Sequence, residues 1–281
     1  MVRPALRKKV AGYLQERYRV STRKAAQNAR IARATMYYRK KSDPHVQGLR
    51  IAIRDAASKR PRFGWRRILV LLRREGHQVG ETRLLRLYRE EGLSLRKKSP
   101  KRRRSAVVRQ PKSAATSPNE IWSMDFMHDR LSNGRKFRLL TVVDVFTREC
   151  VALEIAYGFK SMDVIAALRH AIAKRGRPQT LRCDNGSEFT STEFDQWTYW
   201  NRIAIDFSRP GKPTDNAYVE SFNGRVRQEL LNPSWFDTIE QARREAGAWR
   251  RDYNEIRPHR SLGNKSPREF VLARERELSS G

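Results

Sequence analysis

Apolar positions near the start of the chain recur every three or four residues. The spacing of Leu6, Val10 and Leu14 predicts a helix over residues 4–19. Two shorter helices are expected after it, the second of them over residues 33–39. Helix, short turn and helix is the arrangement of a helix-turn-helix unit, and a plain three-helix bundle with a basic surface is the alternative.

The helical period continues in the next fifty residues. Helices are expected over residues 44–59, 62–76 and 81–91, and the middle one carries an apolar stripe beside several arginines. This second small helical unit also resembles a helix-turn-helix. Residues 94–119 then lose all periodicity and are rich in Ser, Pro, Lys and Arg, which predicts a linker.

From residue 120 the pattern changes to alternation, which is typical of strands. Three consecutive strands, followed by alternating helices and strands, predict an α/β domain. The arrangement that fits is a ribonuclease-H-like mixed five-stranded sheet with flanking helices, preceded by two small all-α helix-turn-helix domains. The strands are expected over residues 120–128, 137–146, 150–157, 179–183 and 203–207, and the helices over 161–174, 191–201, 214–230 and 239–254. The predicted domains are a helix-turn-helix region (1–42), a second helix-turn-helix-like domain (43–93), a basic linker (94–119), the catalytic core (120–235) and a C-terminal helical extension (236–281).

The distribution of charge along the chain indicates what kind of partner the protein binds. The formal net charge is +30, and residues 1–112 hold 34 Lys and Arg against 7 Asp and Glu, whereas the rest holds 26 against 23. Such asymmetry points to a nucleic-acid-binding N-terminal part joined to a nearly neutral domain. A merely solvated basic surface is the alternative. Membrane attachment is disfavoured, because no segment combines a basic face, an aromatic anchor and a lipidation motif.

Other composition features narrow the class of protein. No run of 18 apolar residues is present, and the basic N-terminus is not followed by the apolar region of a secretory signal. Cys150 and Cys183 stand alone, which indicates reduced thiols and no zinc site. We therefore expect a cytosolic protein.

Several polar, basic and aromatic residues are candidates for DNA contact. Residues on and after the third helix would reach the major groove, and the basic run of the linker would contact phosphates unless it is only a solvated tether. Trp65 either stacks on nucleic acid or anchors the core of the helical unit. The candidates from these regions are Thr35, Tyr37, Arg39, Lys40, Trp65, Arg66, Arg67, Lys101, Arg102 and Arg103.

Three carboxylates are placed to share a site. Asp125 lies within the apolar first strand, where burial of a charge is costly without a partner or a role. Asp184 ends the fourth strand in CDNGSEF, and Glu220 lies in the first turns of a long helix. Carboxylates converging from a central strand, its neighbour and an abutting helix would hold two Mg²⁺ ions for phosphodiester chemistry.

Each member of this trio has rivals. Asp129 follows Asp125 by four positions as the strand ends, and Asp144 closes the second strand, where it either lies near the site or pairs with Arg148. Glu188 is expected to cap a local turn. Asp215 is expected to cap the helix that carries the glutamate.

In combination, the motifs resemble a known family. CDNGSEF, SRPGKPTDNAYVESFNGRVRQELL and YNEIRPHRSLGNKSP are similar to the DDE transposases of bacterial insertion sequences, the integrase-like insertion-sequence-three family. FGWRRI and VGETRLLRLYREEGL, within residues 63–93, are similar to the second helix-turn-helix region of that family. The resemblance covers essentially the whole chain. No His-His-Cys-Cys set precedes residue 120, which differs from retroviral integrases.

The resemblance implies a specific activity. Asp125, Asp184 and Glu220 match the DDE triad, which would bind two Mg²⁺ or Mn²⁺ ions; the family cuts one strand at an element end and joins the freed 3′-hydroxyl to another phosphodiester. Arg227 would point to the phosphates of the site, or it is only an exposed charge. Asn185 with Gly186 would let DNA approach the second aspartate. His259 would contact phosphate or brace a helix. The partners implied are the terminal inverted repeats and target DNA, held by at least a dimer.

Two alternatives to a complete transposase remain. Related enzymes are often frameshift fusions with an upstream reading frame, so this chain is either active alone or a DNA-binding regulatory or partial product that binds ends without cutting. A ribonuclease-H-type nuclease would act on RNA–DNA hybrids, but it does not explain two DNA-reading units.

Overall fold

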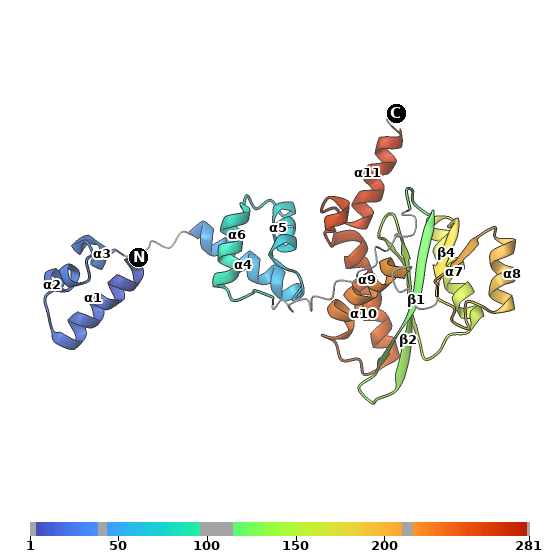
Figure 1. Cartoon of the computed structure of the whole chain (residues 1–281), viewed down its shortest axis with the longest axis horizontal. Coiled ribbons are helices and arrows are strands. Elements are labelled where there is room, and N and C mark those ends of the chain that lie inside the picture. Colours follow the sequence, from blue (N-terminus) through green and yellow to red (C-terminus); the bar gives the residue numbers. More distant parts are fainter. Residues whose placement is uncertain (1–3, 39–43, 96–114, 210–215, 280–281) are drawn as a thin grey trace. The chain divides into compact units, whose positions relative to one another are not determined.

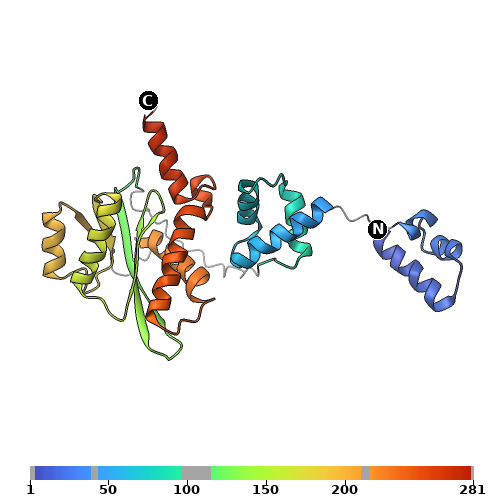
Figure 2. The ribbon, with the colours of Figure 1, turned by 180° about the vertical axis from the view of Figure 1, so that it is seen from behind.

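The chain forms two compact units, Met1–Ile51 and Ala52–Gly281, and the helix α4 (Pro44–Lys59) crosses the boundary between them. The computed structural model is drawn in Figure 1 and seen from behind in Figure 2. None of the helices in its described part combines the length and apolarity needed to cross a bilayer. The structure describes residues 4–38, 44–95, 115–209 and 216–279.

The first unit contains the start of α4 and, before it, three helices around a small alanine-rich core. These are α1 (Pro4–Tyr18), α2 (Thr22–Asn28) and α3 (Arg33–Tyr37). Ser21 caps α2, because its hydroxyl accepts a hydrogen bond from the Lys24 amide. The buried side chains are Ala11, Ala25 and Ala29, with Leu14, Val20, Ile31 and Met36 packed against them. Small side chains bring the helices close together, as the expected helix-turn-helix arrangement requires.

The second unit begins with two helices whose apolar stripes are buried. α5 (Trp65–Arg74) buries Ile68 and Leu72, and α6 (Glu81–Glu90) buries Leu84 and Leu87. Arg66, Arg73 and Arg74 of α5 and Arg86 and Arg89 of α6 are exposed, as expected for amphipathic helices, whereas Arg67 and Arg83 are half-buried.

The domain that follows is built on a mixed sheet of five strands in the order β3-β2-β1-β4-β5. The pairs β1–β2 and β2–β3 are antiparallel, whereas β1–β4 and β4–β5 are parallel. The prediction of a five-stranded mixed sheet is therefore confirmed. The strands are β1 (Ile121–Arg130), β2 (Lys136–Asp144), β3 (Cys150–Ala156), β4 (Thr180–Cys183) and β5 (Ala204–Phe207).

Helices cover both faces of this sheet (Figure 1). Trp122 and Met124 face the side covered by α7 (Ser161–Arg175) and α8 (Thr192–Trp200). The opposite side packs on α9 and α10 and holds alternate residues of the strands, among them Phe137, Leu139 and Val143. Because β1 alternates in the same way, Asp125 faces α9 rather than α7. The helices of that second face are α9 (Ala217–Val226), the π-helical turn η2 (Arg227–Leu231) and α10 (Ile239–Arg251).

The two long helices predicted here end earlier than expected. The helix predicted through Leu230 stops at Val226, and the π-helical turn η2 follows it; likewise α10 passes at residue 252 into the π-helical turn η3 (Asp252–Ile256). The wider turn lets the adjacent Leu230 and Leu231 both reach the core. The helical periodicity of the sequence does not reveal this wider turn, because packing against the sheet stabilises the turn.

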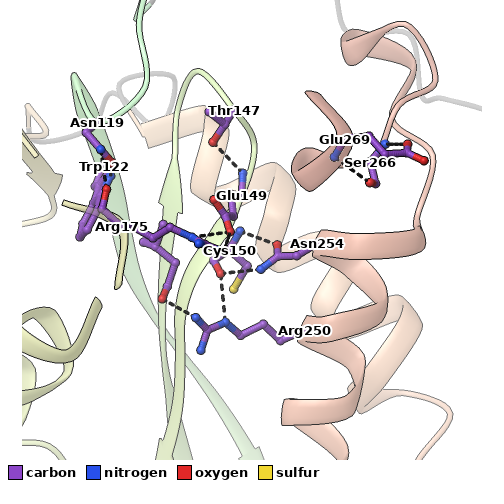
Figure 3. A network of polar contacts seen from close by, with 11 residues as sticks. Asn119, Trp122, Thr147, Glu149, Cys150, Arg175, Arg250, Asn254, Ser266 and Glu269 are labelled. Atoms are coloured by element: carbon purple, nitrogen blue, oxygen red, sulfur yellow. Dashed lines mark hydrogen bonds and ion pairs between the residues drawn. The ribbon is translucent and has the colours of Figure 1, made fainter. Parts of the chain in front are cut away.

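The segment after α10 is fastened to β3 by side chains that bond to backbone (Figure 3). Asn254 accepts a hydrogen bond from the Cys150 amide at 2.9 Å and donates one to its carbonyl at 3.0 Å. Arg250 donates to the carbonyl oxygens of Cys150 and Val151. The chain then continues through η4 (Arg260–Leu262) to α11 (Pro267–Ser279). Part of the YNEIRPHR motif is therefore structural.

Candidate active site

Asp125 and Asp184 become neighbours through the parallel pairing of β1 and β4. The recorded pairs are Ile121–Thr180, Trp122–Leu181 and Ser123–Arg182. Continuing that register by two residues places Asp184, which directly follows β4, beside Asp125. The second aspartate is exposed, as expected for a residue just beyond the end of a strand.

Glu220 reaches the same region from α9, which packs on β1 and β2. One turn further along this helix, the Asn223 amide nitrogen donates a hydrogen bond of 2.9 Å to the Asp125 carboxylate. Residues three apart share a helix face, so Glu220 lies on the same side of α9 as Asn223. The glutamate is exposed, whereas Asn223 is buried.

The electrostatics of Asp125 show that the charges of Asp184 and Glu220 act on it. Burial raises the pKa of Asp125 to about 6, and the charges of Asp184 and Glu220 add to this rise. Hydrogen bonds from the Phe126 amide and from Asn223 oppose it. Two acidic neighbours around a largely buried carboxylate form a region that favours a cation.

The three carboxylates do not form a closed ligand set in this structure. Within the described ranges, no three His, Cys, Asp or Glu side chains are close enough together to hold a metal ion on their own. The donors present are hard carboxylate oxygens, which suit Mg²⁺, an ion that usually keeps water and substrate oxygens in its shell. The site therefore fits a divalent ion whose remaining ligands come from outside the protein.

A hydrogen-bonded pair beneath Asp125 was missed by sequence reasoning. Thr141 lies directly opposite Asp125 on β2 and is completely buried. Its hydroxyl lies 2.8 Å from the Asn223 side-chain oxygen and 3.0 Å from the Asp125 carbonyl oxygen. The asparagine three positions after Glu220 was the available sign, since a polar residue there shares the face of the glutamate.

The turn after β4 holds Asp184 through a backbone contact. The Gly186 amide donates a hydrogen bond of 3.1 Å to the Asp184 carboxylate. A Cβ atom at Gly186 would lie only 3.1 Å from the same carboxylate oxygen, so glycine permits this close approach. The adjacent Asn185 is exposed beside the carboxylate, where it was expected to meet DNA.

The rival carboxylates have other partners. Asp144 is buried, and its two oxygens accept hydrogen bonds from the backbone amides of Asn119, Phe146 and Thr147, so it organises a turn. The Arg148 amide donates a hydrogen bond of 3.0 Å to the Asp144 carbonyl oxygen, and the Arg148 guanidinium stacks on the ring of Tyr218 at 4.2 Å.

The remaining rivals lie at the edges of the site. Glu188 forms an ion pair with Arg138 of β2, so the expectation of a purely local cap is incomplete. Asp129 accepts a hydrogen bond from the adjacent Arg130 amide at 2.8 Å. Asp215, expected as a helix cap, lies outside the described residues.

The basic residues proposed for the site differ in accessibility. Arg227 is exposed, and its guanidinium donates to the His128 carbonyl oxygen at 3.2 Å, near the end of β1. His259 is buried, and its ring packs edge-on against Tyr253 at 4.8 Å. Burial, followed by the charges of nearby arginines, lowers the pKa of His259 to about 3. The imidazole is therefore neutral and enclosed, which matches the bracing alternative rather than contact with phosphate.

The candidate DNA contacts of the helical regions are only partly described. Tyr37 is exposed and Thr35 half-buried on α3. Arg66 is exposed and stacks on the ring of Trp65 at 4.5 Å. Arg67 is instead half-buried against Glu229, with a nitrogen–oxygen distance of 3.5 Å. The candidates Arg39, Lys40, Lys101, Arg102 and Arg103 lie outside the described residues.

Comparison with known proteins identifies the family. Two integrase core domain models match residues 115–213 and 201–267, and an HTH-like domain model matches residues 45–103. The chain is 42% identical over 258 residues to the insertion element IS407 uncharacterized 31.7 kDa protein of Burkholderia multivorans, covering 92% of this chain and 93% of that protein. It is 30% identical over 267 residues to the probable transposase for insertion sequence element IS1353 of Shigella flexneri, covering 86% of this chain and 50% of that protein.

A solved structure supports the fold. The cryoEM structure of the simian T-cell lymphotropic virus intasome in complex with PP2A regulatory subunit B56 gamma contains a chain that aligns with a TM-score of 0.52 at 22% identity. The alignment covers 78% of this chain and 73% of that one. The predicted ribonuclease-H-like core, preceded by a helical region, is confirmed. The chain belongs to the integrase-core transposases of bacterial insertion sequences, the insertion-sequence-three family.

Proposed function

We propose that this protein is a DDE-type polynucleotidyl transferase that binds the ends of its insertion sequence, cleaves one strand and joins the freed end to another phosphodiester. The observation that carries the proposal is the convergence at Asp125. The β1–β4 register brings Asp184 beside it, and the hydrogen bond from Asn223 brings the Glu220 face of α9 over it.

In this mechanism the three carboxylates share one task. Asp125, Asp184 and Glu220 supply oxygen ligands for Mg²⁺ or Mn²⁺, and we propose two ions. Bound divalent ions would activate the attacking water or 3′-hydroxyl and stabilise the leaving oxygen. Asn223 orients the Asp125 carboxylate through its amide, and the Gly186 amide orients that of Asp184. Mutual repulsion, which helps raise the pKa of Asp125 to about 6, is relieved when a cation is bound.

The N-terminal regions would supply DNA recognition. We propose that residues 1–42 and 43–93 bind double-stranded element ends, that residues 94–119 connect them to the core of 120–235, and that residues 236–281 brace it. Thr35 and Tyr37 are candidates for base or backbone contact, with Arg66 stacked on Trp65 as a further one. Because two ends must be held together, at least a dimer on DNA is expected, in the bacterial cytoplasm.

End cleavage and strand transfer on labelled terminal repeats test the proposal. With Mg²⁺ or Mn²⁺, the wild-type protein should produce a nicked end and a joined product. Asp184→Asn and Glu220→Gln should each reduce both steps about a thousandfold or more, corresponding to ~4 kcal/mol, while end binding persists. Asp129→Asn, which changes a carboxylate on the same strand as Asp125, is the matched control. Wild-type activity in Asp184→Asn would exclude the assigned site.

A second candidate is an end-binding regulator that acquires catalysis only as a longer fusion. Full affinity for the ends with no cleavage in either metal would favour this candidate. Restored cleavage by the fusion protein would then locate the missing element upstream.

A further inference from the structure

Within the second unit, three arginines of the helix-turn-helix-like region hold it against the sheet domain and its C-terminal extension (120–281), which are together called the core in this subsection. Arg60 donates to the Asp252 carboxylate, with an Nε–Oδ1 distance of 3.1 Å. Arg74 donates to the Glu269 carboxylate at 2.6 Å and also to the carbonyl oxygens of Ile256 and Asn264. These contacts join segments that are about 190 residues apart in the sequence.

The third contact is more deeply enclosed. The Glu229 carboxylate accepts hydrogen bonds from Nε and Nη2 of Arg257, at 3.0 and 2.7 Å. The same carboxylate lies 3.5 Å from the Arg67 guanidinium. Arg257 is 2% exposed and stacks near Phe63 of the helix-turn-helix-like region. Burial, followed by the charge of Arg257, lowers the pKa of Arg67 to about 10, so Arg67 still carries its charge at neutral pH. One glutamate thus joins an arginine of each region.

A groove lies beside these docking contacts, and residues of both regions line it. Its volume is about 570 Å³, and it is lined by residues of the loop before α5, of α5 and α6, and by Pro258, Arg260 and Asn264 of the core. We call it the arginine groove, because its walls include Arg62, Arg66, Arg67, Arg89 and Arg260. Of the described residues that line it, none is acidic.

The arginines of this region therefore divide into two groups. Arg60, Arg67 and Arg74 contact carboxylates and hold the docked arrangement. By contrast, Arg62, Arg89 and Arg260 are exposed, and none of the three forms an ion pair with any described residue. Arg66 is also exposed and stacks on Trp65. Uncompensated guanidinium groups along a groove create a positive potential that attracts a polyanion.

The distribution of these groups favours a chain of phosphates over a single phosphate. They come from a loop, two helices and a turn that lie in two different regions of the sequence, instead of meeting at one helix N-terminus. The flat guanidinium of arginine suits the oxygens of a phosphodiester backbone, and indole and guanidinium planes suit nucleic acid surfaces.

We propose that the arginine groove binds the sugar–phosphate backbone of the element end, and that the docking contacts hold it open so that DNA held by the helix-turn-helix-like region is also held by the core. The inference rests on the proposed function for the identity of the DNA. It goes beyond that function in making a core residue, Arg260, and the docking carboxylates part of end binding.

Neutralising a carboxylate that forms a docking contact distinguishes binding in the groove from long-range electrostatic attraction of DNA. Glu269→Gln takes a negative charge away from a DNA-binding protein, so long-range electrostatics alone predicts equal or tighter binding. Loss of the Arg74 contact loosens the groove instead, and end affinity of the full-length protein, measured by fluorescence anisotropy, should fall about fivefold, the scale of a ~1 kcal/mol contact. Glu277→Gln is the control on the same helix, where the carboxylate pairs only locally with Arg274. Equal or tighter binding by Glu269→Gln would overturn the proposal.

The salt dependence provides a second measurement. Arg260→Ala should weaken end binding and lower the slope of log affinity against log salt by about one, as expected for one lost phosphate contact. Arg274→Ala, an exposed arginine on α11, should leave the slope unchanged. An unchanged slope for Arg260→Ala contradicts the inference.

These binding measurements separate the two proposals. They are made in the Asp184→Asn background, so cleavage does not enter. If wild-type protein binds ends but never cuts them, catalysis fails while the groove stands. If groove variants bind as tightly as wild type and the wild-type protein cuts, the groove alone is refuted.

Discussion

Replacing Asp125 by asparagine is expected to stabilise the metal-free protein above neutral pH. Burial, followed by the charges of Asp184 and Glu220, raises the pKa of this carboxyl to about 6, whereas the value in an unfolded chain is about 3.9. The folded protein therefore binds the proton more tightly than the unfolded chain. Protonation of Asp125 stabilises the fold fully below about pH 4, and this contribution is lost as the pH rises through about 6.

The size of the effect follows from the shift. About two pKa units correspond to ~3 kcal/mol of unfolding free energy, or a rise in Tm of roughly 6–12 °C for a domain of this size. Hydrogen bonds need not be lost. The new amide oxygen still accepts from Phe126, and a flipped Asn223 accepts from the new amide nitrogen while donating to the Thr141 hydroxyl.

Thermal unfolding in EDTA from pH 4 to 8, followed by tryptophan fluorescence of the core, measures this gain. Asp125→Asn should melt higher than wild type at pH 8 and similarly at pH 4. Asp129→Asn, on the same strand, should show no such pH-dependent difference. A constant gap across the pH range, or a lower Tm for Asp125→Asn at pH 8, would refute the electrostatic reasoning. Adding Mg²⁺ should raise the Tm of wild type more than that of the variant, since the ion needs the carboxylate.

Three further predictions concern the supports of the site. Asn223→Ala should raise the Mg²⁺ concentration needed for half-maximal cleavage and lower the unfolding free energy by about 1–3 kcal/mol, because the Asp125 carboxylate loses its hydrogen bond from Asn223 and the buried Thr141 hydroxyl loses one of its two contacts. Asn223→Asp, which restores no amide donor, should not rescue the metal dependence. Gly186→Ala should keep its Tm within a few degrees but lose roughly tenfold or more in cleavage, since the added methyl displaces the Asp184 carboxylate, a proposed metal ligand. Unchanged cleavage would contradict this. Arg257→Ala should lower the unfolding free energy measured in urea by about 3–5 kcal/mol, because Glu229 loses its two-point partner, and a loss below ~1 kcal/mol would show that the pair is dispensable.

Local patterns determined the outline of the catalytic-type domain. Strand alternation and helical spacing report which side of each element is buried, because backbone geometry fixes the directions of successive side chains. They placed Asp125 within an apolar strand and Asp184 just beyond another one. The charge of the first third of the chain likewise indicated where nucleic acid would bind.

The sequence could not establish which strands are neighbours. Asp125 and Asp184 are 59 positions apart, and only the parallel pairing of β1 with β4 brings them side by side. Similarly, the importance of Asn223 depends on the orientation of α9 over the sheet. Asp144 was a candidate for the site by its position in the sequence. In the structure its carboxylate oxygens accept hydrogen bonds from backbone amides of Asn119 and Phe146.

Arg66 and Arg67 show the same division most clearly. They are adjacent, chemically identical and equally suited to DNA by composition. The fold leaves Arg66 exposed on Trp65 and directs Arg67 to Glu229, a residue 162 positions away. The sequence by itself determined the periodicity, the charge and the supply of carboxylates, since these are local properties of the chain. Only the tertiary structure decided which of these groups meet, because the role of a charged side chain depends on the distant residue that packs against it.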